Sequence, residues 1–257
     1  MIPKIIHYCW FGRGEMPKLM KKCLKSWKKF CPDWQIVRWD EDSFDVNSTL
    51  WTKQAYEARK FAFVSDYVRL RALYEMGGVY LDTDVELVQP IDRFLEHPAF
   101  SGFESTDTVQ TGIIGAEKDN AVIESWLEYY KDRAYLVDEK PVMVPNVSHI
   151  TENLKARGLV MDDTLQVIDG MAIYPQTWFC PLSAVSIQRK ITENTHVMHY
   201  FTSTWRTDKA KKDFARVKRH QRWWYRALEW LRYLPNRLVR KLLGNGTIDK
   251  IKKKMGR

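Results

Sequence analysis

The chain has 257 residues, 45% of them hydrophobic and 28% charged, so it can bury its own core and is not a disordered protein. Its net charge of +9 is unevenly distributed: residues 206–257 hold 18 Lys and Arg against 4 Asp and Glu, whereas residues 1–205 hold 23 against 28. A slightly acidic body therefore precedes a strongly basic C-terminal segment. No run of about 18 apolar residues is present, so we expect no membrane-spanning helix.

The cysteines show no CxxC pair and no histidine at zinc-site spacing, so we expect buried free thiols. They are Cys9, Cys23, Cys31 and Cys180. The first residues, MIPKIIHYCWFG, are not a signal peptide in pattern, because Pro3, Lys4 and His7 interrupt the apolar run. We therefore expect a cytoplasmic, reducing compartment.

The chain begins with a β-α-β pattern. Residues 4–11 are rich in β-branched and aromatic residues and predict a buried strand. Over residues 16–30, apolar side chains recur every four positions from Leu19 to Trp27, which predicts a helix with a lysine-rich outer face. Residues 35–40 predict the second strand. This start indicates an α/β domain with a mostly parallel central sheet and flanking helices.

The longest helical pattern, residues 52–78, is expected to contain a break and ends at a glycine pair. Residues 79–88 follow as a strand that Asp82 and Asp84 interrupt. The remaining expected strands are 99–103, 111–116, 165–175 and 195–201, and the remaining helices lie near 120–133 and 147–157.

After residue 207 the pattern is helical, and we expect a domain over residues 1–207 followed by a basic amphipathic tail over 208–257. Its apolar stripe includes Phe214, Trp224 and Leu228, with Arg and Lys on the other faces. This composition suits a helix lying on an anionic membrane surface; docking of the stripe on the protein itself or on a second subunit is the alternative. A nucleic-acid partner is not expected, because an apolar stripe suits an interface better than a groove.

Asp82 and Asp84 are the clearest indication of chemistry. They follow a glycine pair and a buried apolar strand, so their charge lies at the edge of a core and needs a cation or hydrogen bonds. Carboxylate oxygens suit Mg²⁺ or Mn²⁺. A solvated turn capped by aspartates is the alternative. A phosphatase with an aspartyl nucleophile is excluded, because Glu86 occupies the position at which that motif requires Thr or Val.

Three blocks in this order, IPKIIHYCWFG, FVSDYVRLRALYEMGGVYLDTDVEL and HYFTSTW, resemble the family 32 glycosyltransferases, whose sugar-binding region carries a DXD motif. The family includes bacterial capsule and lipopolysaccharide enzymes, yeast mannosyltransferases and α-galactosyltransferases, and it is related to the large clostridial glucosylating toxins. The resemblance covers residues 2–205. It implies a GT-A type nucleotide-sugar-binding fold, a UDP- or GDP-sugar donor, Mn²⁺ (or Mg²⁺) as cofactor, and retention of anomeric configuration.

The resemblance also implies roles for individual residues. Asp82 would hydrogen-bond the ribose and the donor sugar, and Asp84 would ligate the metal that bridges the diphosphate. Asp66 and Arg69 share one helix face and would reach the donor sugar and nucleotide; the alternative is a simple intrahelical ion pair, which is worth little at a surface. The other residues assigned to donor binding are Tyr8, Trp10, Phe11, Thr111, Gly112, Ser203 and Trp205.

His199 is expected to be the third metal ligand beside Asp84 and Asp82, since imidazole is a suitable ligand for Mn²⁺. His196 is the alternative. Ser203 and the Trp205 indole N–H would donate to the β-phosphate, where charge develops as the donor bond breaks.

Together these expectations describe a retaining, metal-dependent hexosyltransferase at the inner face of a membrane. Its expected donor is UDP-galactose, and its acceptor is a glycan or lipid-linked glycan in bacterial surface polysaccharide synthesis. No residue identifies itself as a covalent nucleophile, so front-side displacement is the expected mechanism. The alternatives are a nucleotide-sugar-binding protein without catalysis, against which the intact carboxylate pair argues, and a nucleic-acid-binding protein.

Overall fold

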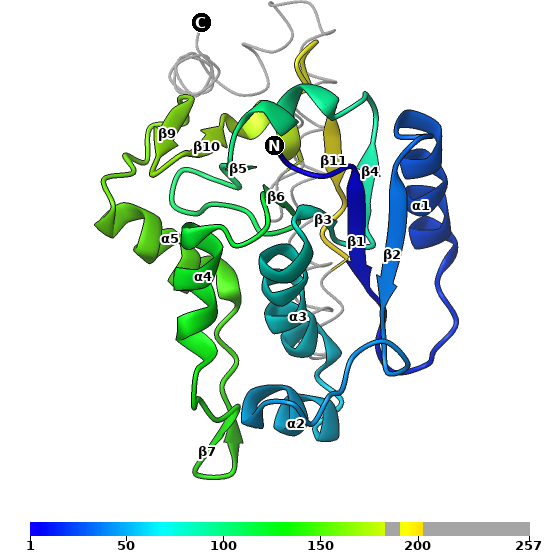
Figure 1. Ribbon diagram of the computed structural model, residues 1–257, viewed down its shortest axis with the longest axis vertical. Helices are drawn as coiled ribbons and strands as arrows, with labels where there is room; N and C mark the ends of the chain where they lie inside the picture. The colour runs from blue at the N-terminus through cyan, green and yellow to red at the C-terminus, as the bar shows by residue number, and fades with distance from the viewer. Residues whose placement is uncertain (183–190, 203–257) are drawn as a thin grey trace, which may run out of the picture. The chain divides into compact units, whose positions relative to one another are not determined.

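A computed structural model describes residues 1–182 and 191–202 of the chain (Figure 1). Ser203 and Trp205 lie outside these residues, as do the predicted tail and the predicted boundary at residue 207. In the part that the structure describes, no helix is long and apolar enough to cross a membrane.

A seven-stranded sheet, ordered β2-β1-β3-β6-β5-β10-β9, forms the centre of the described residues. Its strands are β1 (Ile5–Cys9), β2 (Gln35–Trp39), β3 (Gly78–Leu81), β5 (Ala99–Gly102), β6 (Ile113–Ala116), β9 (Gln166–Ile168) and β10 (Met171–Tyr174). β1 is parallel to β2 and β3, and β5 is parallel to β10. Only β6 and β9 run against their neighbours in this sheet. The predicted α/β class with mostly parallel strands is confirmed.

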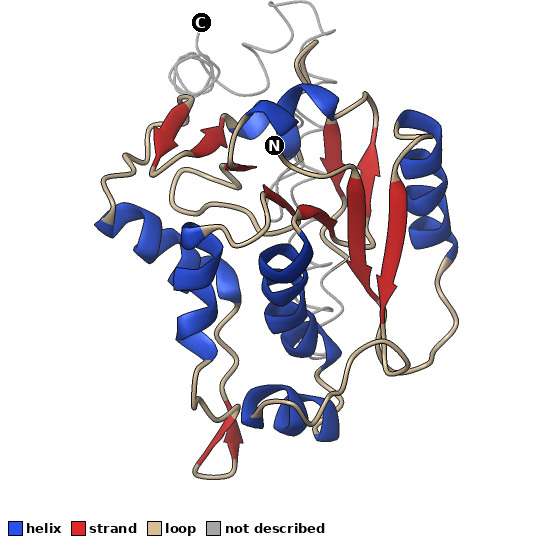
Figure 2. Cartoon of the chain, in the orientation of Figure 1, coloured by secondary structure: helices blue, strands red, loops and turns tan. Residues whose placement is uncertain are grey.

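Helices cover both faces of the sheet, and Figure 2 shows α1 and α3 to either side of β1 and β2. The helices are α1 (Lys18–Phe30), α2 (Leu50–Glu57), α3 (Phe61–Met76), α4 (Ala121–Leu127), α5 (Asn146–Ala156) and α6 (Gln176–Phe179), with short 3₁₀ turns η1 (Asp92–Glu96) and η2 (Glu128–Tyr130). The side chains of β3 alternate between two hydrophobic cores, one on each face of the sheet. Tyr80 belongs to the core cluster under α3, whereas its neighbours Val79 and Leu81 belong to the cluster on the other face.

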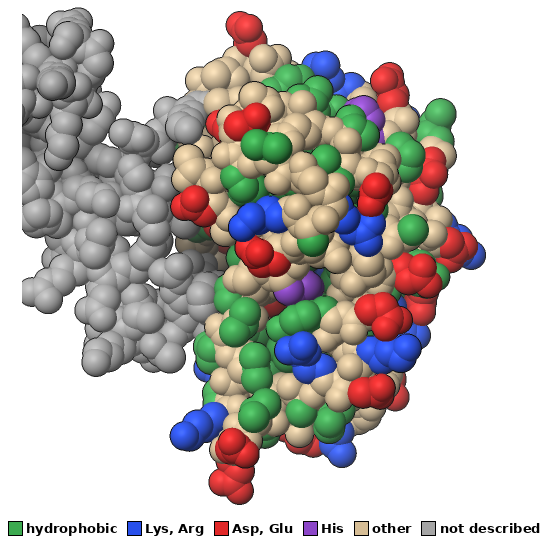
Figure 3. Space-filling view, turned by 90° about the vertical axis from the view of Figure 1, so that its left-hand side faces the viewer, with side chains coloured by type: hydrophobic (Ala, Val, Ile, Leu, Met, Phe, Trp, Pro, Cys, Tyr) green, Lys and Arg blue, Asp and Glu red, His purple; other side chains and the backbone are tan. Residues whose placement is uncertain are grey.

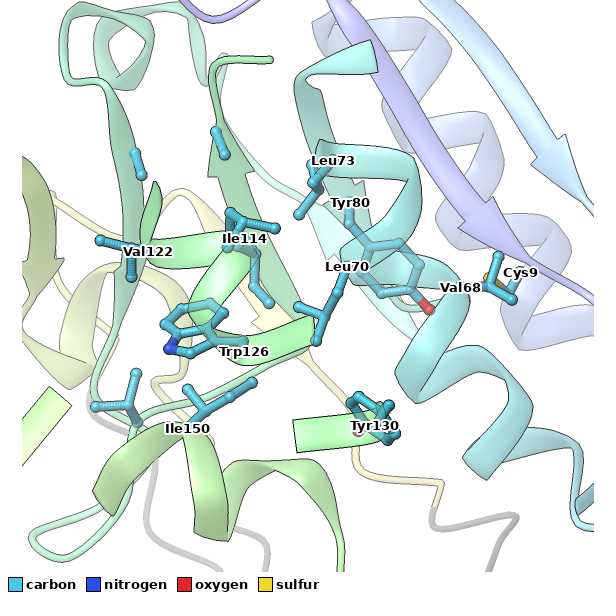
Figure 4. Close-up of a cluster of buried hydrophobic side chains, with 14 of the residues drawn as sticks. Cys9, Val68, Leu70, Leu73, Tyr80, Ile114, Val122, Trp126, Tyr130 and Ile150 are labelled. Carbon is cyan, nitrogen blue, oxygen red and sulfur yellow. The ribbon is translucent and has the colours of Figure 1, made fainter. Parts of the chain in front are cut away.

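The core on the α3 side brings together residues that are distant in the sequence (Figure 4). Leu70 and Leu73 of α3 lie with Ile114 of β6 and Trp126 of α4, and all four are fully buried. Burial of large apolar side chains of this kind contributes roughly 1.5–3 kcal/mol each. This packing fixes α3 against the sheet, and with it the polar residues that α3 carries at its N-terminal end.

The predicted break in the long helical pattern lies between α2 and α3, where Arg59 has a left-handed backbone (φ 55°). Thr49 caps α2 by accepting a hydrogen bond from the Thr52 amide. α3 ends at Gly77, and a Cβ on the next residue, Gly78, would lie 2.7 Å from the Ile5 carbonyl oxygen. Glycine at this position therefore lets β3 pack closely against β1.

The predicted strand over residues 79–88 is divided by the two aspartates into β3 and a separate strand, β4 (Val85–Leu87). The Val85 amide donates to the Asp82 carbonyl and closes a tight turn. β4 leaves the main sheet and pairs antiparallel with β11 (Val197–His199), which places His199 opposite Val85. This second, two-stranded sheet brings a residue from the end of the described chain to the Asp-x-Asp turn.

The expectation of one strand over residues 165–175 was wrong. Residues 166–174 form the hairpin β9–β10, which turns at Asp169 and Gly170. Both turn residues have a positive φ (49° and 81°), as a two-residue hairpin turn requires, and Asp-Gly is a favoured pair for it. A second small hairpin, β7 (Leu136–Val137) with β8 (Lys140–Pro141), was not predicted.

The four cysteines are buried and free, as expected. On the face in Figure 3, Lys and Arg side chains are interspersed with Asp and Glu. The basic character of the whole sequence is thus concentrated in residues 206–257, which hold 18 of the 41 Lys and Arg.

Candidate functional site

A cavity of about 630 Å³ opens at the carboxyl ends of β1 and β3. Its walls are the loop after β1, the first turns of α3, the β3–β4 turn, the start of α5 and the residues after β11. Ligands of α/β proteins bind in this position, outside the carboxyl ends of the strands. The cavity is large enough for a small-molecule ligand.

Asp82, Asp84 and His199 meet at this cavity. Each offers one ligand atom, and these atoms all lie within 4.8 Å of one another. His199 Nε2 lies 3.3 Å from Asp84 Oδ1. The other carboxylate oxygen of Asp84 accepts hydrogen bonds from the amide and the hydroxyl of Thr202, both at 2.8 Å. Asp84 is therefore held by His199 at one carboxylate oxygen and by Thr202 at the other, and only 7% of its surface is exposed.

The charges of this group depend on one another. Burial is the largest single influence and lowers the pKa of His199, but the adjacent Asp84 carboxylate and then Cys180 together outweigh it, so the pKa lies well above its ordinary value. Burial raises the pKa of Asp84, but the His199 imidazolium and then the hydrogen bonds from Thr202 bring it below its ordinary value. An ionised pair of this kind is stable only when both partners are present.

A divalent cation fits these residues. His199 Nδ1 is buried and has no hydrogen-bond partner among the described residues, which is unusual for a polar atom in a folded protein. Two carboxylates and an imidazole form a donor set that suits Mn²⁺ or Mg²⁺. The solvated, capped turn that the sequence left open does not fit, because Asp84 and His199 are both buried.

Gly112 explains how His199 can approach so closely. A Cβ at this position would lie 2.9 Å from both Cε1 and Nδ1 of His199 and 3.4 Å from Asp82 Oδ2. The Gly112 carbonyl also accepts a hydrogen bond from the Asp82 amide at 2.8 Å. The absence of a side chain therefore provides the space that the imidazole ring occupies.

Asp66 and Arg69 are not a surface ion pair. Arg69 is 4% exposed, and its guanidinium lies 3.1 Å from Asp66 and 3.2 Å from Asp82. It also donates to the Thr111 carbonyl at 2.7 Å and lies over the Tyr80 ring. Burial raises the pKa of Asp66 to about 6, although Arg69 opposes the shift. Arg69 thus links α3 to the Asp-x-Asp turn through a buried polar network.

Asn146 is a candidate that the sequence did not reveal. It lies at the start of α5, lines the cavity and is 3% exposed. Its Oδ1 accepts from the Thr111 hydroxyl at 2.9 Å, and its Nδ2 is buried without a partner in the part of the chain that the structure describes. Next to Pro145 it resembles an ordinary helix-start residue, so no local pattern identifies it. Its free amide N–H group is available to a ligand.

Some of the other residues predicted to bind the donor line the cavity, and others do not. Trp10, Phe11 and Thr111 line the cavity. Tyr8 does not: it packs against Trp27 with ring centroids 5.6 Å apart, in the core on the opposite face of the sheet. Alternate residues of a strand point to opposite faces, so Tyr8 cannot share a face with its neighbours along β1. Tyr8 thus lies in the core and is not among the residues that line the cavity, and its donor-binding role stays a prediction.

His196 does not compete for the metal. Its Nδ1 donates to the Pro90 carbonyl at 2.7 Å, and its ring stacks on Trp178. His199 is therefore the histidine of β11 and its flanks that faces the two aspartates.

Residues 17–101 match the family model described as "Glycosyltransferase sugar-binding region containing DXD motif". Inositol phosphoceramide mannosyltransferase 3 of Schizosaccharomyces pombe is 31% identical over 121 residues, which are 46% of this chain and 34% of that protein. Mannosyl phosphorylinositol ceramide synthase CSH1 of Saccharomyces cerevisiae is 26% identical over 144 residues, 53% of this chain and 38% of that protein. The matches thus span about a third of the length of these curated relatives, and both are fungal proteins rather than bacterial capsule enzymes.

Two solved structures are similar over most of this chain. A glycosyltransferase involved in glycosylating the major capsid of PBCV-1 is 14% identical, with 82% of this chain and 98% of that one covered and a TM-score of 0.48. The galactosyltransferase LgtC is 13% identical, with 83% and 94% covered and a TM-score of 0.43. The segment that matches the family model, residues 17–101, includes Asp66, Arg69, Asp82 and Asp84.

Proposed function

We propose that this chain is a metal-dependent glycosyltransferase of the GT-A type that transfers a hexose from a nucleoside-diphosphate sugar with retention of configuration. The observation that carries the proposal is the group of half-buried Asp82 with buried Asp84 and His199, which lines a ligand-sized cavity. This group lies in a region that matches the DXD glycosyltransferase model. A divalent cation bound there supplies Lewis-acid stabilisation of the departing diphosphate.

The residues around this group would each bind a different part of the donor. The Asp66 carboxylate accepts hydrogen bonds from sugar hydroxyl groups, and Asn146 donates one from its free Nδ2. Arg69 holds Asp66 and Asp82 in place and keeps their charges compensated. Trp10 and Phe11, which also line the cavity, would surround the nucleotide base. Ser203 and Trp205, outside the described residues, remain proposed donors to the β-phosphate.

We propose front-side displacement as the mechanism. The carboxylates of Asp66, Asp82 and Asp84 each lie against a cation or a hydrogen-bond donor, which suits binding better than attack on carbon. The acceptor oxygen forms its bond to the anomeric carbon on the face that the diphosphate leaves. The bond from that carbon to the diphosphate oxygen breaks with its electron pair, and this oxygen takes the acceptor's proton.

UDP-galactose is the first donor we propose, as expected from the resemblance. GDP-mannose is the second, because the two fungal relatives carry mannosyl transfer in their names. The test is a thermal-shift series with UDP, GDP and their hexose derivatives, with and without Mn²⁺, followed by donor hydrolysis and transfer with the donor that binds. Stabilisation reports ligand affinity directly. If no nucleotide stabilises the protein when Mn²⁺ is present, the proposal is rejected; binding without turnover would favour a nucleotide-sugar-binding protein.

We further propose a glycan or lipid-linked glycan acceptor in bacterial surface polysaccharide synthesis, at the inner face of a membrane that residues 208–257 bind. The support is the net charge of +14 in residues 206–257 together with their apolar stripe. Flotation with liposomes of anionic lipid should carry the full chain and leave a chain ending at residue 207 in solution. Equal sedimentation of both forms at low salt would reject the membrane role, and loss of folding on truncation would assign the stripe to the protein's own core.

A further inference from the structure

Residues 10–14, at the start of the loop between β1 and α1, are held by Glu41. Four of these five residues line the cavity. The Glu41 carboxylate, in the connection between β2 and α2, accepts a hydrogen bond from the Gly12 amide at 2.6 Å and one from the Tyr56 hydroxyl at 2.9 Å. One carboxylate oxygen thus ties the loop to α2.

Close packing against α3 leaves the loop little room to move at Gly12. Gly12 has a left-handed backbone (φ 91°), and a Cβ there would lie 2.3 Å from the ring of Phe61, the first residue of α3. The Trp10 indole N–H donates back across the loop to the Gly14 carbonyl at 2.8 Å. A shift of the Gly12 amide would therefore move Trp10, whose side chain lines the cavity.

The residues that follow Gly12 and Glu41 form a second contact between the same two segments. Arg13 donates to the two carboxylate oxygens of Asp42 at 2.6 and 3.2 Å. Both side chains of this second pair are largely exposed, so it contributes little by itself. The Glu41 contact differs, because its Oε2 is buried and has no hydrogen-bond partner among the described residues. Burying a carboxylate oxygen without a partner is unfavourable. Capping of the local turn alone therefore does not explain why Glu41 occupies this position.

We propose that Glu41 is a positioning residue that holds loop 10–14 in the conformation that binds the nucleotide part of the donor. This inference rests on the proposed function. In the proposed binding mode the loop contacts the nucleotide and not the bond that breaks, so its contacts stabilise the bound substrate and the transition state equally. Loss of such uniform binding raises KM for the donor and leaves kcat unchanged.

The test compares four variants of the full chain. Glu41→Ala removes both hydrogen bonds, Glu41→Gln retains an acceptor oxygen for both donors, and Tyr56→Phe removes one donor. Asp45→Asn is the matched control, because Asp45 is an exposed carboxylate in the same connection that, among the described residues, accepts hydrogen bonds from Asn47 alone. Each variant is measured by hydrogen–deuterium exchange of the loop peptide and by titration with UDP and with GDP in the presence of Mn²⁺.

For Glu41→Ala we expect faster exchange confined to residues 10–14 and about tenfold weaker binding of the nucleotide, because the hydrogen bond from the Gly12 amide to a charged carboxylate is lost. Tyr56→Phe should show a smaller change of the same kind. Glu41→Gln keeps an acceptor oxygen without the charge and should fall between Glu41→Ala and the unmodified chain, whereas Asp45→Asn should behave like the unmodified chain. With the donor in hand, Glu41→Ala should raise KM about tenfold at constant kcat.

Two results would overturn the inference on their own. Unchanged exchange in Glu41→Ala would show that Glu41 does not hold the loop. Faster exchange with unchanged nucleotide affinity would show that the loop does not position the nucleotide. A chain that binds neither UDP nor GDP would reject the proposed function and the nucleotide role together, while the exchange data would still decide whether Glu41 holds the loop.

Discussion

Replacing Gly112 with alanine tests the metal site without altering any ligand atom. The added Cβ would lie 2.9 Å from Cε1 and Nδ1 of His199. Non-bonded carbon atoms prefer about 3.5–4.0 Å, so the imidazole must move by roughly 0.6–1 Å. Phe201 stacks on the ring and limits its movement. Asp82 Oδ2, at 3.4 Å from the new atom, is at an ordinary contact distance and need not move.

A shift of this size is several times the tolerance of a metal–ligand bond, which is about 0.2 Å. Changes beside a metal ligand typically reduce metal affinity about 10–100-fold. We therefore expect Gly112→Ala to weaken Mn²⁺ binding by that factor in a calorimetric titration, with a loss of transfer that high Mn²⁺ concentration partly restores.

A double-mutant cycle separates this cause from general damage to the fold. In the His199→Ala background there is no ring to displace, so Gly112→Ala should change the Mn²⁺ dissociation constant by less than about twofold. Additive losses in the cycle, or unchanged Mn²⁺ affinity in Gly112→Ala alone, would refute the assignment of His199 as a ligand that Gly112 accommodates.

Four further predictions follow from the site and its surroundings. Asp84→Ala should lower transfer more than about 100-fold and abolish the Mn²⁺ dependence of UDP binding while the protein stays folded; near-normal turnover would contradict the metal assignment. His199→Ala should weaken Mn²⁺ binding and His196→Ala should not, and the reverse result would move the role to His196. Asn146→Ala should lower kcat/KM for the donor about tenfold through one lost hydrogen bond to the sugar, with unchanged Mn²⁺ affinity. Burial lowers the pKa of His149, in α5, to about 4. The folded protein therefore needs the neutral imidazole, and the free energy of unfolding should fall as the pH falls from about 6.5 towards 4. In urea unfolding, His149→Phe should recover about 2 kcal/mol of this free energy at about pH 5 and nothing at about pH 8.

The sequence identified the parts of the site that lie within one local pattern. The glycine pair, the apolar strand and the two aspartates are contiguous, and their turn at the end of β3 was predictable from that order. The break between α2 and α3 was also visible, because a helical pattern of that length needs one. Predictions succeeded where one stretch of chain carries both the structural pattern and the chemistry.

Roles that depend on distant pairing could not be settled by a local pattern. The sequence favoured His199 and left His196, three positions away, as the alternative, and only the pairing of β11 with β4 decides which of them meets Asp84. Asn146 depends on where α5 begins relative to Thr111, which no local pattern contains. Tyr8 packs against Trp27 in the core and does not line the cavity, because side chains alternate along a strand and the position of the cavity depends on how distant strands and helices are arranged.

The charges at the site explain why the cation and the nucleotide belong together. Asp66, Asp82 and Asp84 face the positive charges of Arg69 and protonated His199, so full ionisation leaves an excess of one negative charge. An anionic diphosphate would be repelled from this surface in a medium that screens poorly. A divalent cation that takes the place of the His199 proton adds one net positive charge and removes the excess. If a cation binds here as we propose, it would convert a site that repels the donor into one that can accept it, and donor affinity would then depend on the cation through electrostatics as well as through direct ligation.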